Sequence, residues 1–172
     1  MRIHQYEKAF LAAGGAVLIL CLGALAWTTF VMGLHLPGVA GRIDPQAVRT
    51  TPPFDQPGVR EVAPGRYEAV IIATAWRFEP SEIRVPAGAE ITFVSTTTDV
   101  LHGFNIEGTR LNMMLIPGQI SRNTYTFREP GEFLLICHEY CGLGHHTMVG
   151  KVVVEAALRT GATAQPAGSQ AH

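Results

Sequence analysis

The sequence has little charge. Lysine, arginine, aspartate and glutamate make up 16% of its 172 residues, and the formal net charge is −1. Between Tyr67 and Glu155 acidic residues outnumber basic ones, a balance that suits a basic partner better than nucleic acid or an anionic membrane surface. The hydrophobic share of 47% excludes a wholly disordered chain and allows one core of modest size.

Charge is missing altogether from Ala9 to Leu34. A helix of this length would be roughly 39 Å long, enough to cross a hydrocarbon core of about 30 Å. A cleaved signal peptide has a shorter apolar stretch, of ~7 to 15 residues, and the buried helix of a soluble protein would keep a polar face. We therefore predict one transmembrane helix at residues 9–36, preceded by a short N-terminus at residues 1–8.

Prolines and glycines are concentrated in residues 37–66. Proline-rich segments stay extended, so we expect a semi-rigid linker that holds a folded domain just off the membrane. Residues 156–172 are rich in alanine, glycine, threonine and glutamine and have no hydrophobic period, which predicts a disordered C-terminal tail.

Short runs of alternating apolar and polar residues, separated by turn residues, fill residues 67–155. This pattern predicts strands at residues 67–75, 82–85, 90–96, 103–107, 121–127, 132–137 and 149–155. About seven short strands in a segment of this size favour a mainly β fold, either a Greek-key barrel or a sandwich.

Only two cysteines lie outside the apolar run, because Cys21 falls within it. Cys137 and Cys141 are close in sequence and far from a third partner, so they form a disulfide, bind a metal or remain idle thiols. Their segment, CHEYCGLGHHTM, has the spacing C-x3-C-x3-H-x2-M. Thiolate, imidazole and thioether are soft ligands that favour copper, and Met148 is a ligand type that zinc sites hardly use.

A second imidazole is available from His102, which begins a predicted strand after a turn. A blue mononuclear copper site uses one cysteine, two histidines and a weak methionine, so the second cysteine favours two copper ions. The alternatives are a disulfide, whose short loop would gain little from closure, and a Cys2His2 zinc site, which would leave Met148 without a role.

The segment resembles the copper-A motif of cytochrome c oxidase subunit II at every ligand position and in its spacing. His102 fits the same pattern, and so do the residues at 116–118 and 125–133. The resemblance covers residues 67–155 and implies a cupredoxin-like fold. A single anchor helix is similar to the short branch of the haem–copper oxidases, the ba-type.

The resemblance also implies a set of ligands for a dinuclear copper centre. These are Cys137 and Cys141 as bridges, His102 and weakly bound Met148 on one copper, and His145 with the backbone carbonyl of Glu139 on the other. In the two-helix branch a glutamate at this position also reaches a magnesium ion, and magnesium is left unassigned here.

By the same resemblance, the chain would accept electrons from cytochrome c and pass them to haem in subunit I, where oxygen is reduced. No catalytic residue is then expected in this chain. The metal domain would lie on the periplasmic side of the cell membrane, with residues 1–8 in the cytoplasm. The alternatives are a tethered mononuclear cupredoxin, the copper-A domain of nitrous oxide reductase, and a quinol oxidase subunit II, which keeps the fold without the site.

Several neighbours of these ligands are open to two interpretations. Trp76 aligns with the aromatic residue that the family uses where electrons enter from the cytochrome, or it is a core or rim aromatic. Asp99 orients a ligand loop or serves as a turn residue, and we favour the turn. His138 is expected at the surface or behind the ligands, and only spacing favours His145 over His146.

Overall fold

A computed structural model describes residues 4–32 and 40–156. The chain divides into two compact units, residues 1–36 and residues 37–172, and each is described by itself. The predictions for residues 1–3, for the end of the membrane segment and the beginning of the linker at 33–39, and for the tail at 157–172 lie outside the described residues.

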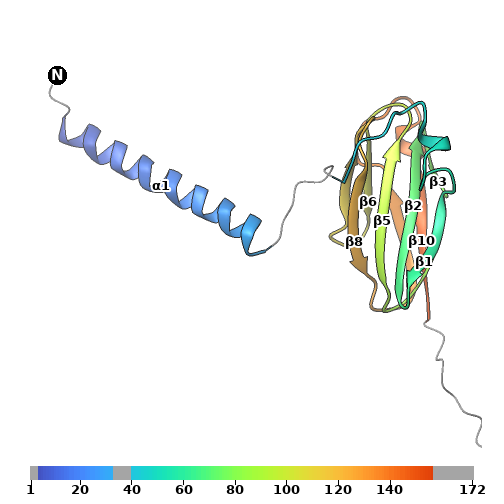
Figure 1. Cartoon of the computed structure of the whole chain (residues 1–172). Helices are drawn as coiled ribbons and strands as arrows, with labels where there is room; N and C mark the ends of the chain where they lie inside the picture. Colours follow the sequence, from blue (N-terminus) through green and yellow to red (C-terminus); the bar gives the residue numbers. More distant parts are fainter. Residues whose placement is uncertain (1–3, 33–39, 157–172) are drawn as a thin grey trace, which may run out of the picture. The chain divides into compact units, whose positions relative to one another are not determined.

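The first unit contains the helix α1, Gln5–Phe30 (Figure 1). It begins with a reciprocal cap, in which the backbone N–H of His4 donates to the Glu7 carboxylate at 2.9 Å, and the charge of Glu7 suits the helix N-terminus. Near its end the hydroxyls of Thr28 and Thr29 donate to the Leu25 carbonyl, so both are satisfied inside the helix. No residue of α1 is buried against other described residues, and the helix is long and apolar enough to cross a membrane.

The second unit is built from two β-sheets (Figure 1). The first sheet contains β1 (Gly58–Ala63), β2 (Arg66–Thr74), β3 (Arg77–Glu79), β5 (Glu90–Thr97) and β8 (Ser121–Thr126). The second contains β4 (Glu82–Pro86), β6 (His102–Ile106), β7 (Asn112–Leu115), β9 (Gly131–Ile136) and β10 (Val149–Glu155). Each of the seven strands predicted from sequence is present within one residue at either end.

The strand order is that of a Greek-key sandwich. The first sheet runs β1-β2-β5-β8 with β3 on β2, and the second runs β4-β10-β9-β6-β7. The pairs β2–β5 and β10–β4 are parallel and the other pairs are antiparallel, so the chain crosses repeatedly between the sheets. The expected fold class, a cupredoxin-like Greek-key sandwich after one N-terminal helix, is confirmed.

The core between the sheets is aliphatic and aromatic. Ile71 and Phe93 of the first sheet pack with Phe104, Leu135 and other buried side chains of the second. The rings of Phe93 and Phe104 lie 5.8 Å apart, an efficient tilted contact between the two layers. This core fixes the strand ends from which the β5–β6 and β9–β10 loops emerge.

The expected linker at 37–66 differs from the structure. In its described part, Ile43, Val48 and Phe54 are buried against Val70 and other residues on the outer face of the first sheet, and β1 extends that sheet. The reason is that β2 is apolar on both faces from Ala69 to Ala73, so the outer face also needs a cover. The prolines and glycines here punctuate a folded segment.

Candidate metal centre

Two loops meet at one end of the sandwich. The first joins β9 to β10 and contains Cys137 to Met148, with a short 3₁₀ turn at His145–Thr147. The second joins β5 to β6 and ends at His102, the first residue of β6. Because β6 pairs with β9, the two loops leave neighbouring strands and their side chains converge.

The convergence brings soft donor atoms together. The Sγ atoms of Cys137 and Cys141 lie 3.7 Å apart. The Nδ1 of His102 is 3.9 Å from the Cys137 sulfur, and the Nδ1 of His145 is 3.6 Å from the Cys141 sulfur. The thioether sulfur of Met148 lies 3.8 Å from the Cys141 sulfur. In the described part of the chain, His102, Cys137 and Cys141 form the one cluster with the geometry of a metal site, and all three are buried.

Glu139 presents its main chain to this cluster. Its carbonyl oxygen lies 3.2 Å from the Cys137 sulfur. The donor set therefore comprises two thiols, two imidazoles, a thioether and a carbonyl, which is more than one four-coordinate ion uses. It fits two soft ions that share the sulfurs, since sulfurs 3.7 Å apart can both lie about 2.3 Å from one metal.

The alternatives from sequence fit this geometry less well. Both cysteines are free, and their separation is far longer than the ~2.05 Å of a disulfide bond. A Cys2His2 zinc site would not account for Met148, which is buried to 1% exposure with its sulfur beside Cys141. His146 is exposed, whereas the ring of His145 faces the Cys141 sulfur.

Asp99 holds the ring of His102 from the side away from the sulfurs. Its Oδ1 lies 2.9 Å from the His102 Nε2, which leaves the Nδ1 toward Cys137. Burial raises the pKa of Asp99, but hydrogen bonds from His102 and from the amides of Ala75 and Val100 outweigh it and bring the pKa below its ordinary value. The sequence favoured a plain turn role, and the structure adds the contact with a ligand.

The Cys141 thiol is protonated in the metal-free protein at neutral pH. Burial, followed by the hydrogen bond and the charge of neighbouring Cys137, raises the pKa of Cys141 to about 11. A thiolate is the form that binds a metal, so loading the site must displace protons into solvent. The backbone N–H of Gly103 donates to the Cys137 sulfur at 3.4 Å, a contact that stabilises the charge that develops there.

His138 lies outside the cluster. Its ring packs on Gly103 so closely that a side chain at that position would meet the His138 ring and backbone, and its Nε2 hydrogen-bonds to Oδ1 of Asn112. Sequence reasoning missed Gly103 and Asn112. The available signal for Gly103 was a glycine directly after the expected ligand His102, inside a strand, which is typical of a close backbone approach.

Trp76 lies beside the ligand loop, 41% exposed, between β2 and β3. Its indole Nε1–H donates to the carbonyl of Cys141 at 3.0 Å. The exposed side chains of Tyr140 and Leu143 belong to the same loop. The end of the domain that carries the cluster therefore has exposed aromatic and aliphatic surface.

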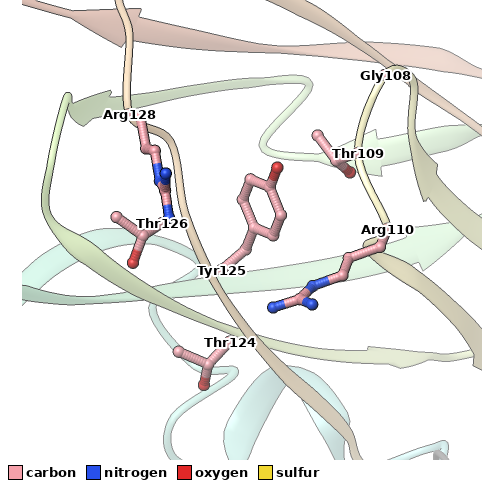
Figure 2. Close-up of a pocket in the computed structure, with 7 residues that line it drawn as sticks. All are labelled: Gly108, Thr109, Arg110, Thr124, Tyr125, Thr126 and Arg128. Atoms are coloured by element: carbon pink, nitrogen blue, oxygen red, sulfur yellow. The ribbon is translucent and has the colours of Figure 1, made fainter.

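A separate hollow lies at the other end of the strands (Figure 2). It is lined by Gly108, Thr109, Arg110, Thr124, Tyr125, Thr126 and Arg128. Thr126 pairs with Glu90 at the beginning of β5, whereas the ligand loop that carries His102 follows the end of β5. The hollow has no soft donor and is not part of the metal centre.

The comparisons with known proteins agree with this geometry. The family model for cytochrome c oxidase subunit II, periplasmic domain, matches residues 64–157. The chain is 42% identical over 157 residues to a cytochrome c oxidase subunit 2 of Thermus thermophilus, covering 89% of this chain and 94% of that one. It is 30% identical to an alternative cytochrome c oxidase subunit 2 of Bradyrhizobium diazoefficiens, covering 83% of this chain and 55% of that one.

A solved structure extends the likeness to three dimensions. A chain in the cryo-EM structure of a heme-copper terminal oxidase dimer superposes with a TM-score of 0.70 and 32% identity. The match covers 88% of this chain and 100% of that chain.

Proposed function

This chain belongs to the cytochrome c oxidase subunit II family, and from that premise we propose that it holds two copper ions and carries electrons from a cytochrome c to haem in subunit I. Membership makes it the electron-accepting subunit of an oxidoreductase complex. The donor, the contact with subunit I and the ligand set are the parts that we propose. Oxygen reduction then belongs to the haem-bearing partner.

The observation that carries the proposal is the pair of buried free thiols 3.7 Å apart. Cys137 and Cys141 would hold both copper ions, and two further residues would hold each ion. For one copper the further ligands are His102, which lies beside Cys137, and Met148, which lies beside Cys141. For the other they are the Glu139 carbonyl, beside Cys137, and His145, beside Cys141. The distances therefore support two sets of four donor atoms that share one pair of sulfurs.

When bound, a copper pair with shared thiolates supplies reversible one-electron oxidation and reduction with little change in bond lengths. Other residues of the chain orient the proposed ligands and exclude water from them. Asp99 orients the ring of His102, and the Gly103 amide donates to the Cys137 sulfur. The cysteines are 7% exposed and His102 is fully buried, so water has little access to the donor atoms.

We assign the electron donor to the surface around Trp76. The indole is partly exposed and is joined by one hydrogen bond to the carbonyl of Cys141, a short connection between solvent and a bridging ligand. The acidic excess of residues 67–155 favours a basic donor such as a cytochrome c, with association that weakens as salt is added.

The chain is a membrane-anchored subunit. The helix α1 provides the anchor, and we place residues 40–156 on the periplasmic side, with the N-terminus in the cytoplasm. Support for this side comes from the family model, whose description is that of a periplasmic domain. Reporter fusions at the two ends of the chain test the orientation.

Metal analysis of the full-length chain in detergent tests the copper centre. We expect two copper ions per chain and a paramagnetic resonance spectrum in which one unpaired electron is split by two equivalent copper nuclei. A single copper whose nucleus alone splits the spectrum would instead support a mononuclear cupredoxin. A chain that binds no metal would reject both assignments. Haem spectra of the complex isolated from its own membrane would identify the partner subunit.

A further inference from the structure

The side chain of Trp76 packs on the loop Cys137–Met148 from outside it. The ring of Trp76 lies over the backbone of Gly142 and Gly144. A methyl group placed on Gly144 would meet the Trp76 ring, with Cε3 only 2.6 Å away, and one placed on Gly142 would lie 3.1 Å from Nε1. Two glycines in the segment Cys141-Gly-Leu-Gly-His145 therefore let the indole approach the main chain.

A hydrogen bond fixes the indole on this backbone. Its Nε1–H donates to the Cys141 carbonyl at 3.0 Å, so the bond acts on the peptide group of a bridging cysteine. The next hydrogen bond along the loop runs from the His145 amide to the Gly142 carbonyl at 3.1 Å. The Gly142 carbonyl belongs to the peptide group next to that of Cys141. The orientation of the Cys141 main chain thus also bears on His145.

The indole is itself held by the other half of the site. Trp76 follows Ala75, whose amide donates to Oδ2 of Asp99 at 2.7 Å. The Oδ1 of the same carboxylate lies 2.9 Å from His102. The corner between β2 and β3 is therefore bonded to one ligand loop through Asp99 and to the other through Trp76.

We propose that Trp76 is a positioning residue, which fixes the Cys141–His145 part of the ligand loop relative to His102 through its hydrogen bond and its contact with Gly144. This role is distinct from electron transfer through the indole. It rests on the proposed copper site for its consequence, but the loop geometry can be measured without metal. A ring that served only as a route for electrons would leave the metal-free loop unchanged when replaced.

The first experiment measures hydrogen–deuterium exchange in the metal-free full-length chain. Trp76→Phe keeps a ring and removes the N–H, and we expect the His145 amide to exchange about five-fold faster, which corresponds to one hydrogen bond of about 1 kcal/mol. Trp76→Ala should increase that rate further. The Ala87 amide, bonded to the Glu155 carbonyl at the far end of β10, is the internal control and should not change.

The second experiment uses the close contact with Gly144. This glycine has φ −88° and ψ 9°, which alanine adopts, so Gly144→Ala meets an obstacle in Trp76 and not in its own backbone. We expect Gly144→Ala to alter the copper spectrum and the loop exchange in the parent. In the Trp76→Ala background the same substitution should have little further effect, because the obstacle is gone. Gly131→Ala, whose methyl group would meet only the Phe133 ring at an ordinary 3.6 Å, is the matched control.

The outcomes separate this inference from the copper proposal. Equal His145 exchange in the parent, Trp76→Phe and Trp76→Ala would overturn the positioning role, as would additive effects of Trp76→Ala and Gly144→Ala. Failure of the parent to bind two coppers would reject the dinuclear centre, while the metal-free exchange would still decide the role of Trp76. With copper bound, Trp76→Phe should retain two ions and show altered hyperfine splitting.

Discussion

At the scale of single residues, Cys141 and Met148, both proposed as sulfur ligands, differ in what they contribute. Cys141 faces a second thiol, an imidazole and a thioether, whereas Met148 contacts the cluster through one sulfur. We expect Cys141→Ser to abolish the dinuclear centre. We expect Met148→Leu, which nearly conserves volume, to keep two coppers with an altered reduction potential. Copper analysis and resonance spectra check both, and a native spectrum in Cys141→Ser would refute the bridging assignment.

Asp99 carries the second prediction at this scale. Asp99→Asn keeps the shape but removes the charge that holds the His102 ring. We expect two coppers still to bind, with affinity reduced roughly 10- to 100-fold, as is typical when a partner behind a metal ligand is lost. Competition with a chelator measures the change. Glu107→Gln, an exposed carboxylate that follows β6 at its other end, should leave the affinity as it is.

At the scale of elements, the segment before β1 acts as a second cover for the first sheet. Phe54 is 1% exposed and packs in the outer cluster with Val70 and Val94. We expect Phe54→Ala to lower the free energy of unfolding by about 3–5 kcal/mol. Denaturant unfolding measures the loss, and Val62→Ala, at 58% exposure in β1, should change it by no more than ~0.5 kcal/mol. If Phe54→Ala lowered the free energy of unfolding as little as Val62→Ala, the segment would be a linker and not a cover for the sheet.

The same segment is tied to β3 by an ion pair. The two terminal nitrogens of the Arg49 guanidinium donate to the Glu79 carboxylate, at 3.2 and 2.8 Å, and this hydrogen bonding is the main cause that lowers the pKa of Glu79. A lowered pKa in the folded state means that the stabilisation is present above the unfolded pKa and is lost as pH falls through the folded value. Because both groups are well exposed, its size is on the order of 0.5 kcal/mol. The difference in melting temperature between the parent and Arg49→Gln should therefore be present at pH 7 and vanish in acid.

The elements divide into those that local sequence determines and those that depend on distant partners. The β10 pattern and the other long strands were predicted within one residue, because alternation along a strand is a local property. The strands β3 and β7 were missed because three or four residues carry too little pattern, and β1 was missed because it lies in the segment predicted as a linker. The burial of Val48 and Phe54 was missed because it is set by the double-sided apolar β2, which pairs with them only in three dimensions.

The site shows the same division. The proposed ligands Cys137, Cys141, His145 and Met148 follow from spacing within one loop. His102 was suggested by its position after a turn and by the resemblance, and the Glu139 carbonyl by the resemblance alone. The roles of Gly103 and Asn112 required the pairing of β6 with β7 and β9, which brings residues together across long stretches of sequence. Asp99 lies only three residues from His102, but its turn gives no signal for the contact. Nothing local distinguishes an aspartate in a turn from one that also holds an imidazole.

At the scale of the whole molecule, the anchor and the β-domain are separate units. No residue of α1 is buried against the described part of the chain, and both hydrophobic clusters belong to the second unit. We expect a chain that lacks residues 1–36 to leave the membrane fraction and still bind two coppers. Fractionation and metal analysis measure the two properties separately, and loss of copper binding would show that the anchor supports the fold.

The spacing of the two buried sulfurs has a consequence for how the protein matures in the cell. The Cys137 and Cys141 sulfurs lie 3.7 Å apart in the folded domain, so we expect metal to enter without a large rearrangement of the chain. Because both cysteines are only 7% exposed, we expect copper to enter and leave through local opening of the loop, on a timescale that slows as the domain is stabilised.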